Sequence, residues 1–309
     1  MGDFLTKLHE RRIASRYSLI RKLGEGGFGA VYLGRDFETG QEVALKLEHR
    51  LHEPSMLAEE AERYAAFRGL SGFPEMYWYG RQDDYKIMAF ELLGPSLEDV
   101  FAFCDGTFSL KTVIMIVDQL IPRLEALHLS GLLHCDVKPQ NCLLGTGLRG
   151  NIVYITDFGL SREYDARPDE SERDNSSHPR LVGTARYASI RAHQGGSQTP
   201  ADDLESLGYI MIYFLRGHLP WQGLKAHERS EKERLIMEKK KALTIEDLCE
   251  GLPREFAEYL RCIMSVPRGQ PPQYAKLRAL FRALAKKEGI EFDNVFDWTV
   301  RSYLQGIIQ

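Results

Sequence analysis

The stretch Asp136-Val137-Lys138-Pro139-Gln140-Asn141, followed downstream by Asp157-Phe158-Gly159, decides how this chain is interpreted. Its charged and amide side chains recur at this spacing in sites of phosphoryl transfer. The transition state of that reaction spreads negative charge over several oxygens, so a protein mainly supplies position and positive charge. We therefore expect Asp136 to accept the proton of an attacking hydroxyl and Lys138 to lie near the transferred phosphate. Asn141 and Asp157 offer the hard oxygen ligands that Mg²⁺ prefers.

A glycine-rich segment upstream supports this interpretation. Residues 24–31 read Gly-Glu-Gly-Gly-Phe-Gly-Ala-Val, a G-x-G-x-x-G pattern followed by valine. The same glycine spacing marks dinucleotide-binding turns, but there a helix follows the last glycine. Here residues 30–33 are typical of a strand, and a turn at Thr39-Gly40 leads to a second strand over residues 42–47. We expect a β-hairpin that closes over phosphates, with Phe28 shielding them from water, and we reject a dinucleotide-dependent oxidoreductase.

Lys46 ends the sequence Val-Ala-Leu-Lys in the second predicted strand. A lysine at this distance from the glycine-rich segment is expected to hold the α- and β-phosphates and to pair with a helical glutamate. We choose Glu60 for that partner. Glu59 and Glu62 lie on other faces of the same predicted helix, since successive residues are about 100° apart. Spacing alone does not exclude them.

Longer motifs elsewhere resemble those of the casein kinase 1 family of protein serine/threonine kinases, and the resemblance runs from about Tyr17 to Trp298. They are Glu-Leu-Leu-Gly-Pro-Ser-Leu-Glu-Asp-Val-Phe (91–101), Phe-Ser-Leu-Lys-Thr (108–112), Gly-Thr-Ala-Arg-Tyr-Ala-Ser-Ile (183–190), Asp-Asp-Leu-Glu-Ser-Leu-Gly-Tyr (202–209) and Leu-Pro-Trp-Gln-Gly-Leu-Lys (219–225). The Ala-Ser-Ile at 188–190 stands where most kinases have Ala-Pro-Glu, a departure that is typical of this family.

The resemblance implies an α+β, bilobal protein-kinase fold in a single domain over residues 1–309. Residues 1–16 are then an N-terminal extension. Residues 17–93 form an N-lobe with an antiparallel sheet and one helix, and residues 94–309 form a mostly helical C-lobe. Within the C-lobe, residues 110–129 have a helical pattern that Pro122 interrupts, so we expect a kinked helix there.

The resemblance also implies Mg-ATP as a substrate, with adenine bound at a hinge over residues 91–94. The residues expected at the nucleotide are Leu23, Gly24, Gly26, Gly27, Phe28, Gly29, Val31, Ala44, Lys46, Glu60, Phe90, Glu91 and Leu93. Phe90 occupies the position that limits the depth of the pocket. Asp203 resembles the buried kinase aspartate that holds the backbone of the catalytic loop, and a surface helix cap is the alternative.

Members of this family prefer acidic or pre-phosphorylated protein substrates, which they recognise with basic residues of the C-lobe. The expected anion-binding residues are Arg162, Arg173, Gln222, Gly223, Lys225 and Arg229. Arg173 matches the activation-segment arginine of the family's anion pocket only if a gap is placed in the alignment with the family motif. Without a gap, Ser176 stands at that position instead. Acidic residues at 165, 169, 170, 172 and 174 would oppose an acidic peptide.

Cys135 replaces the arginine of the usual His-Arg-Asp sequence. That arginine is the usual partner of a phosphate on the activation segment, for which residues 161–180 are the candidate. In this family the same arginine and Arg162 would form a second anion-binding site, so its loss removes one basic group from that site. We therefore expect activity without phosphorylation of that segment.

The bulk properties describe an ordinary soluble globular protein: 43% of the residues are hydrophobic and 27% are charged. A net charge of −4 argues against nucleic-acid binding. The five cysteines form no C-x-x-C pair, as expected of a reducing compartment. We find neither an apolar run of about 18 residues nor a signal peptide. We expect a monomer in the cytoplasm, the nucleus or both; the N-myristoylation pattern at residues 1–6 is better explained as an ordinary amphipathic terminus.

A pseudokinase, which binds nucleotide or partners as a scaffold without transferring phosphate, is the alternative function. The catalytic set separates the two hypotheses. It is complete in this chain: Lys46, Glu60, Asp136, Lys138, Asn141 and Asp157. A scaffold has no physical reason to retain all six, so the sequence favours an active kinase.

Overall fold

The computed structural model describes residues 12–26, 29–51, 55–164 and 181–306. The chain divides into two compact units. The first comprises residues 1–94, 144–150 and 154–159, and the second comprises residues 95–143, 151–153 and 160–309. Two short downstream segments thus belong to the first unit, because backbone hydrogen bonds join Gly94 to Leu144 and Ile155 to Gly72. The division is less simple than the predicted one at residue 94.

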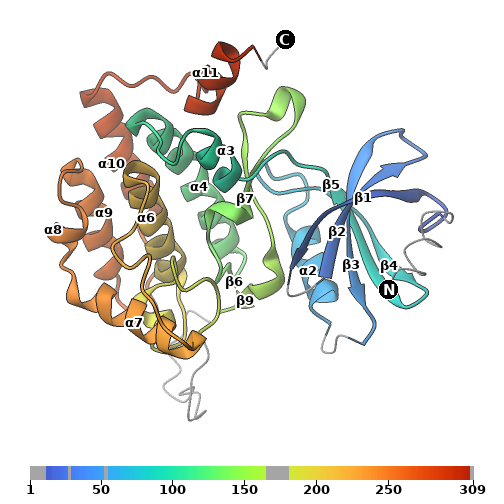
Figure 1. Cartoon of the computed structure of the whole chain (residues 1–309), viewed down its shortest axis with the longest axis horizontal. Coiled ribbons are helices and arrows are strands. Elements are labelled where there is room, and N and C mark those ends of the chain that lie inside the picture. Colours follow the sequence, from blue (N-terminus) through green and yellow to red (C-terminus); the bar gives the residue numbers. More distant parts are fainter. Residues whose placement is uncertain (1–11, 27–28, 52–54, 165–180, 307–309) are drawn as a thin grey trace. The chain divides into compact units, whose positions relative to one another are not determined.

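A five-stranded antiparallel sheet forms most of the first unit (Figure 1). Its strands lie in the order β1-β2-β3-β5-β4. They are β1 (Tyr17–Gly26), β2 (Gly29–Asp36), β3 (Glu42–His49), β4 (Met76–Gln82) and β5 (Tyr85–Glu91). Helix α2 (Met56–Ala66) packs against β4 and β5.

The structure corrects the predicted position of the glycine-rich hairpin. Residues 30–47 do form a hairpin, β2–β3, but the glycines lie at the opposite end of β2, where β1 and β2 meet and Gly26 pairs with Gly29. Gly29 has a φ of +136°, and a Cβ there would lie 2.3 Å from the carbonyl oxygen of Leu47. Only glycine allows β2 to approach β3 this closely.

The two faces of β3 have different roles. Val43, Leu45 and Leu47 point into an apolar cluster that also contains Ile13 and Tyr17. Successive strand residues point to opposite faces, so the even-numbered residues of β3 face the side that carries α2. The N-terminal residues 12–16 are therefore anchored to the sheet, because Ile13 is fully buried in this cluster.

The second unit is mostly helical. Its helices are α3 (Leu97–Phe103), α4 (Leu110–Leu129), α5 (Ile190–His193), α6 (Pro200–Arg216), α7 (Arg229–Ala242), α8 (Ile245–Leu248), α9 (Arg254–Met264), α10 (Tyr274–Lys287) and α11 (Asp297–Leu304). A short sheet of β6 (Leu132–Leu133) and β9 (Arg162–Glu163) accompanies them. Another two-stranded sheet of the chain pairs β7 (Cys142–Leu144) with β8 (Val153–Ile155). The antiparallel sheet with one helix and the helical unit confirm the predicted α+β fold class.

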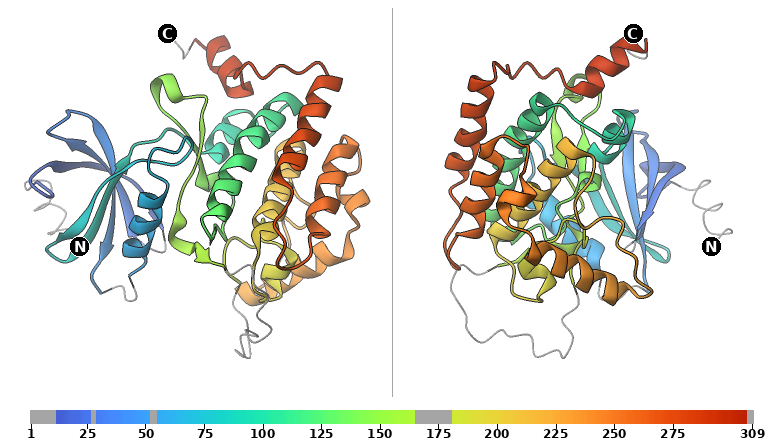
Figure 2. Two further views of the ribbon diagram at one scale, coloured as in Figure 1. Left: turned by 180° about the vertical axis from the view of Figure 1, so that it is seen from behind. Right: turned by 60° about the vertical axis from the view of Figure 1, so that its left-hand side comes forward.

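Helix α4 is the centre of the second unit, because it packs against both α6 and α10 (Figure 2). It continues through Pro122 without a break, and whether it is kinked there stays a prediction. Within the described ranges, no helix combines the length and the hydropathy that a membrane span needs.

Candidate active site

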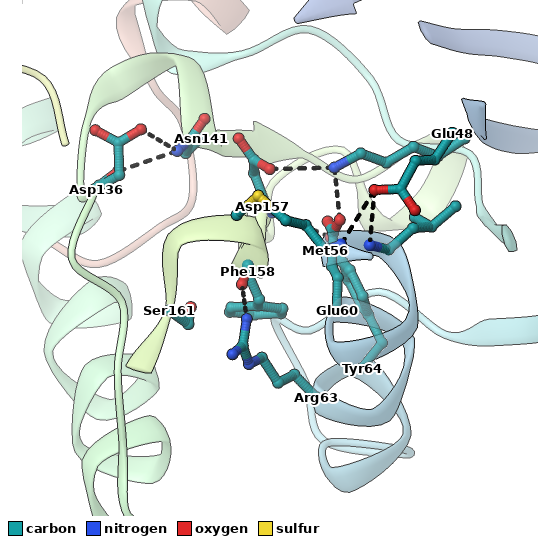
Figure 3. A network of polar contacts seen from close by, with 12 residues as sticks. Glu48, Met56, Glu60, Arg63, Tyr64, Asp136, Asn141, Asp157, Phe158 and Ser161 are labelled. Atoms are coloured by element: carbon teal, nitrogen blue, oxygen red, sulfur yellow. Dashed lines mark hydrogen bonds and ion pairs between the residues drawn. The ribbon is translucent and has the colours of Figure 1, made fainter. Parts of the chain in front are cut away.

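A buried ion pair in the first unit joins β3 to α2. The Nζ of Lys46 lies 2.6 Å from Oε2 of Glu60 and 3.3 Å from Oδ1 of Asp157 (Figure 3). Burial alone would lower the pKa of Lys46, but the carboxylates of Glu60 and Asp157 raise it above its usual value. The lysine is therefore charged at neutral pH. Of the three glutamates considered, Glu60 is the one that meets Lys46; Glu59 pairs with Arg63 and Glu62 is exposed.

The Asp157-Phe158-Gly159 motif is attached to the same helix. The hydroxyl of Tyr64 accepts a hydrogen bond of 3.1 Å from the amide of Asp157, and Nη1 of Arg63 donates one of 2.6 Å to the carbonyl of Phe158. The Phe158 ring is fully buried, and its centroid lies 4.9 Å from the ring centroid of Tyr64 and 5.7 Å from that of Phe67. The position of Asp157 thus depends on the position of α2.

The other described nucleotide candidates also lie in the first unit. They are Leu23, Gly24 and Gly26 on β1, Gly29 and Val31 on β2, Ala44 on β3, Phe90 and Glu91 on β5, and Leu93 after it. Gly27 and Phe28 lie outside the described residues. The Phe90 ring stacks on Tyr64 at 5.8 Å. The Glu91 side chain is engaged by Arg149 at 2.8 Å, and its backbone amide donates a hydrogen bond of 2.8 Å to the carbonyl of Glu75.

Asp136 forms the centre of a polar network in the second unit. It is only 5% exposed. Its Oδ1 accepts a hydrogen bond of 2.8 Å from the Thr184 hydroxyl, and its Oδ2 accepts one from Nζ of Lys138. Nδ2 of Asn141 donates to the backbone carbonyl of Asp136 at 3.0 Å. The carboxylate is therefore held in one orientation, beside a positive charge, where it could accept a proton.

Asp203 holds the backbone just before Asp136. Its Oδ2 accepts from the amide of His134 at 2.8 Å, and its Oδ1 accepts from the amide of Cys135 at 2.9 Å. His128 Nε2 lies 2.8 Å from Oδ2. Burial would raise the pKa of Asp203, but these hydrogen bonds lower it below the usual range. Asp203 is 2% exposed, so it does not act as a surface cap; Thr199 caps α6 instead.

The backbone at Cys135 requires a glycine opposite. Cys135 has a left-handed φ of +64°. A Cβ on Gly183, whose own φ is +92°, would lie 2.4 Å from the carbonyl oxygen of Cys135. This close approach brings the neighbouring Thr184 to Asp136.

Residues 185–189 are held by α7 and by the segment between α6 and α7. The buried Nζ of Lys240 donates to the carbonyls of Ala185 and Ala188, and Trp221 Nε1 donates to the carbonyl of Arg186 at 2.7 Å. Burial lowers the pKa of Lys240 to about 7, and Glu205 opposes that shift. Short sequence motifs could not reveal this arrangement, because it joins residues that are 35 to 55 positions apart.

Most of the expected anion-binding residues that the structure describes are exposed. Arg162 and Lys225 are exposed, and Gly223 is exposed in a turn. Gln222 Oε1 accepts from the amide of Leu219, and Nε of Arg229 lies 2.7 Å from Glu233. Among the described residues, no hydrogen bond or ion pair joins these candidates to one another. Arg173, Ser176 and the acidic residues of 165–174 lie outside the described residues.

The chemistry of the metal candidates fits a magnesium ion that arrives with a nucleotide. Asn141 and Asp157 offer one amide oxygen and one carboxylate, and Mg²⁺ commonly takes one or two protein ligands and completes its shell with water and phosphate oxygens. The part of the chain that the structure describes contains no group of three or more His, Cys, Asp and Glu side chains that could hold a metal by itself.

A comparison with known protein families agrees with this geometry. Residues 17–267 match the family model described as the protein kinase domain. The chain belongs to the protein kinase family. This kinase therefore uses ATP and a divalent metal and acts on protein substrates, as its family does.

Sequence reasoning missed several residues that hold the site. Tyr64 follows Glu60 by one helical turn and shares its face, so the 3.6-residue period could have indicated it. Glu48 follows Lys46 by two residues in a strand. Because strand side chains alternate between the two faces, it shares the face of Lys46, and the two-residue period could have indicated it. His128 and Lys240 carry no local signal, because their partners are distant in sequence.

We predict that Asp203→Ala lowers the free energy of unfolding by roughly 2–6 kcal/mol. Two buried amides, those of His134 and Cys135, lose their acceptor, and each costs about 1–3 kcal/mol. Urea unfolding followed by circular dichroism measures the change. Glu258→Ala, at an exposed acid of α9, is the control and should change the value by less than about 0.5 kcal/mol. A change equally small in Asp203→Ala would contradict the assigned role.

Proposed function

We propose that this kinase transfers the γ-phosphoryl group of Mg-ATP to serine or threonine hydroxyls, in the manner of the casein kinase 1 family. The observation that carries the proposal is the network of Asp136, Lys138 and Thr184. Lys138 two residues after the aspartate, together with Thr184, resembles the serine/threonine pattern rather than the tyrosine pattern. The motifs around residues 91–101 and 183–190 support the choice of family.

Asp136 acts as the general base in this proposal. Its carboxylate accepts the proton of the substrate hydroxyl as the oxygen attacks phosphorus. The Lys138 ammonium offsets charge on the transferred phosphoryl oxygens. The Thr184 hydroxyl, 2.8 Å from Oδ1, keeps the carboxylate plane oriented.

Lys46 holds the α- and β-phosphates from the first unit. Its charge is kept by Glu60 and Asp157, so it presents a fixed cation to the nucleotide. Asn141 and Asp157 would hold Mg²⁺, which neutralises charge on the phosphate oxygens when it is bound. The glycines of β1 and β2 allow backbone amides to approach the phosphates.

Replacement of Asp136 by Asn should lower turnover by about 10²–10⁴, the usual span for a positioned general base. The assay is transfer of labelled phosphate from Mg-ATP to a serine peptide, with melting temperature as the test of folding. Asp247→Asn, at an exposed acid of α8, should leave the rate unchanged. Equal rates for Asp136→Asn and the wild type would overturn the mechanism. A wild type that binds Mg-ATP but transfers no phosphate would favour the pseudokinase.

Activity should not depend on a phosphorylated activation segment. The residue at the usual phosphate-binding position, Cys135, cannot pair with phosphate as arginine does. Its backbone is already held by Asp203, and Thr184 already reaches Asp136. We expect enzyme treated with a phosphatase, and then freed of it, to keep its rate within about twofold. A loss of tenfold or more, restored by autophosphorylation, would contradict this prediction.

Preference for a primed peptide should be weak. Arg229 is exposed and pairs with Glu233, so it must exchange one surface partner for another, and such contacts are worth about 0–1 kcal/mol. We expect phosphoserine three residues before the acceptor to raise kcat/KM by less than about tenfold. Arg229→Ala should reduce that gain.

Arg234→Ala is the matched control for this measurement. Arg234 lies on the same helix and forms the equivalent pair with Glu238. It should leave the gain from the phosphoserine unchanged. A gain of a hundredfold or more that survives Arg229→Ala would refute both the weak preference and the residue assigned to it.

A further inference from the structure

The carboxylate of Glu48, near the end of β3, accepts hydrogen bonds from the first turn of α2 (Figure 3). Its Oε2 accepts a hydrogen bond of 2.6 Å from the hydroxyl of Ser55, the residue that caps the helix. Its Oε1 accepts from the amides of Met56 at 3.1 Å and Leu57 at 3.3 Å. One side chain of the sheet thus binds three donors at the start of the helix.

This contact is costly to leave incomplete. Glu48 is 1% exposed, and a buried carboxylate needs hydrogen bonds and a counter-charge. The amides at the start of α2 have no partner within the helix, and the helix dipole favours a negative charge there. Lys86, opposite Glu48 on β5 and 3% exposed, places its Nζ 3.9 Å from Oε2. The charges and donors therefore hold the Glu48 carboxylate and the helix terminus in one arrangement.

The spacing of the contacts connects Glu48 to the ion pair of the site. Lys46 and Glu48 share a face of β3 and are separated by about 6.6 Å along the strand. On α2, Met56 and Glu60 are separated by about 6 Å along the axis. The strand therefore holds the helix at two points, one turn apart, with matching spacing. A slip of α2 by one residue, about 1.5 Å, would break both contacts.

We infer that Glu48 is a positioning residue, which sets the height and rotation of α2 so that Glu60 meets Lys46. Its effect on phosphoryl transfer passes through Glu60, and through the attachment of Asp157 to the same helix. The expected effect on activity rests on the proposed function. The expected effect of Glu48 on the position of α2 does not.

A purely stabilising role for Glu48 is the alternative, and the chain offers a matched control for it. Asp36, at the end of β2, is also a buried carboxylate of the first unit, 2% exposed. It accepts hydrogen bonds from Arg16, Thr39 and the amide of Glu38. Among the described residues, no hydrogen bond or ion pair joins it to α2. Its loss should destabilise the same unit without moving the helix.

The decisive experiment is a double-mutant cycle on kcat/KM with Glu48→Gln, Glu60→Gln and the double variant. Alone, Glu48→Gln should lower kcat/KM by roughly tenfold, as expected for neighbours in one network. In the Glu60→Gln background the same substitution should cost less than about twofold. Asp36→Asn should lower the melting temperature and have the same effect on kcat/KM in both backgrounds. An effect of Glu48→Gln that is equally large in both backgrounds would overturn the inference.

Hydrogen exchange of residues 55–66 provides a readout that needs no activity. Glu48→Gln should speed exchange at the start of α2, whereas Asp36→Asn should not. Unchanged exchange in Glu48→Gln would refute the positioning role, whether or not the wild type transfers phosphate. A wild type that transfers no phosphate would refute only the proposed function. If Glu48→Gln does not fold, Ser55→Ala removes one donor and should give the same pattern with smaller changes.

Discussion

The buried ion pair between Lys46 and Glu60 is the constraint on which the first unit depends. Two charges removed from water are stabilised only when their geometry is good and their remaining hydrogen-bonding capacity is used. That geometry requires α2 to lie at one height and one rotation against the sheet. The contacts of Glu48, Arg63 and Tyr64 satisfy this requirement, and they attach the Asp157 segment to the helix as well.

The two units use the same physical device. In each, a buried carboxylate accepts hydrogen bonds from two consecutive backbone amides and thereby places a segment that bears the site. Glu48 does so for Met56 and Leu57, and Asp203 does so for His134 and Cys135. A carboxylate is suited to this task, because it is a strong acceptor with two oxygens and because an unmet amide in the interior is costly.

The loss of arginine at Cys135 has a structural counterpart. The backbone at this position is left-handed, its amide is bound by Asp203 and its carbonyl is approached closely by Gly183. None of these contacts requires a side-chain charge. The catalytic loop and Thr184 can therefore be ordered without a phosphate that bridges them, which is consistent with a kinase that needs no activating modification.

The sequence by itself determined the fold class and the two strands that follow the glycine-rich segment, and it pointed to Lys46, Asp136, Asn141 and Asp157 as candidate site residues. These follow from local patterns: the alternation of a strand, the period of a helix, and fixed motif spacings. It also narrowed the partner of Lys46 to three glutamates. It placed the glycine-rich hairpin between β2 and β3, whereas the glycines join β1 to β2.

Only the tertiary structure decided which glutamate meets Lys46, what holds α2 in place, and what supports the catalytic loop. These depend on distances between elements, and a sequence records such distances only where both partners lie in one local pattern. The contact of Lys240 with Ala185 and Ala188 spans more than fifty residues, and that of Asp203 with His134 spans 69. The pairing in each case is set by how the helices pack, since most buried charged and polar groups are hydrogen-bonded to whatever partner the fold places beside them.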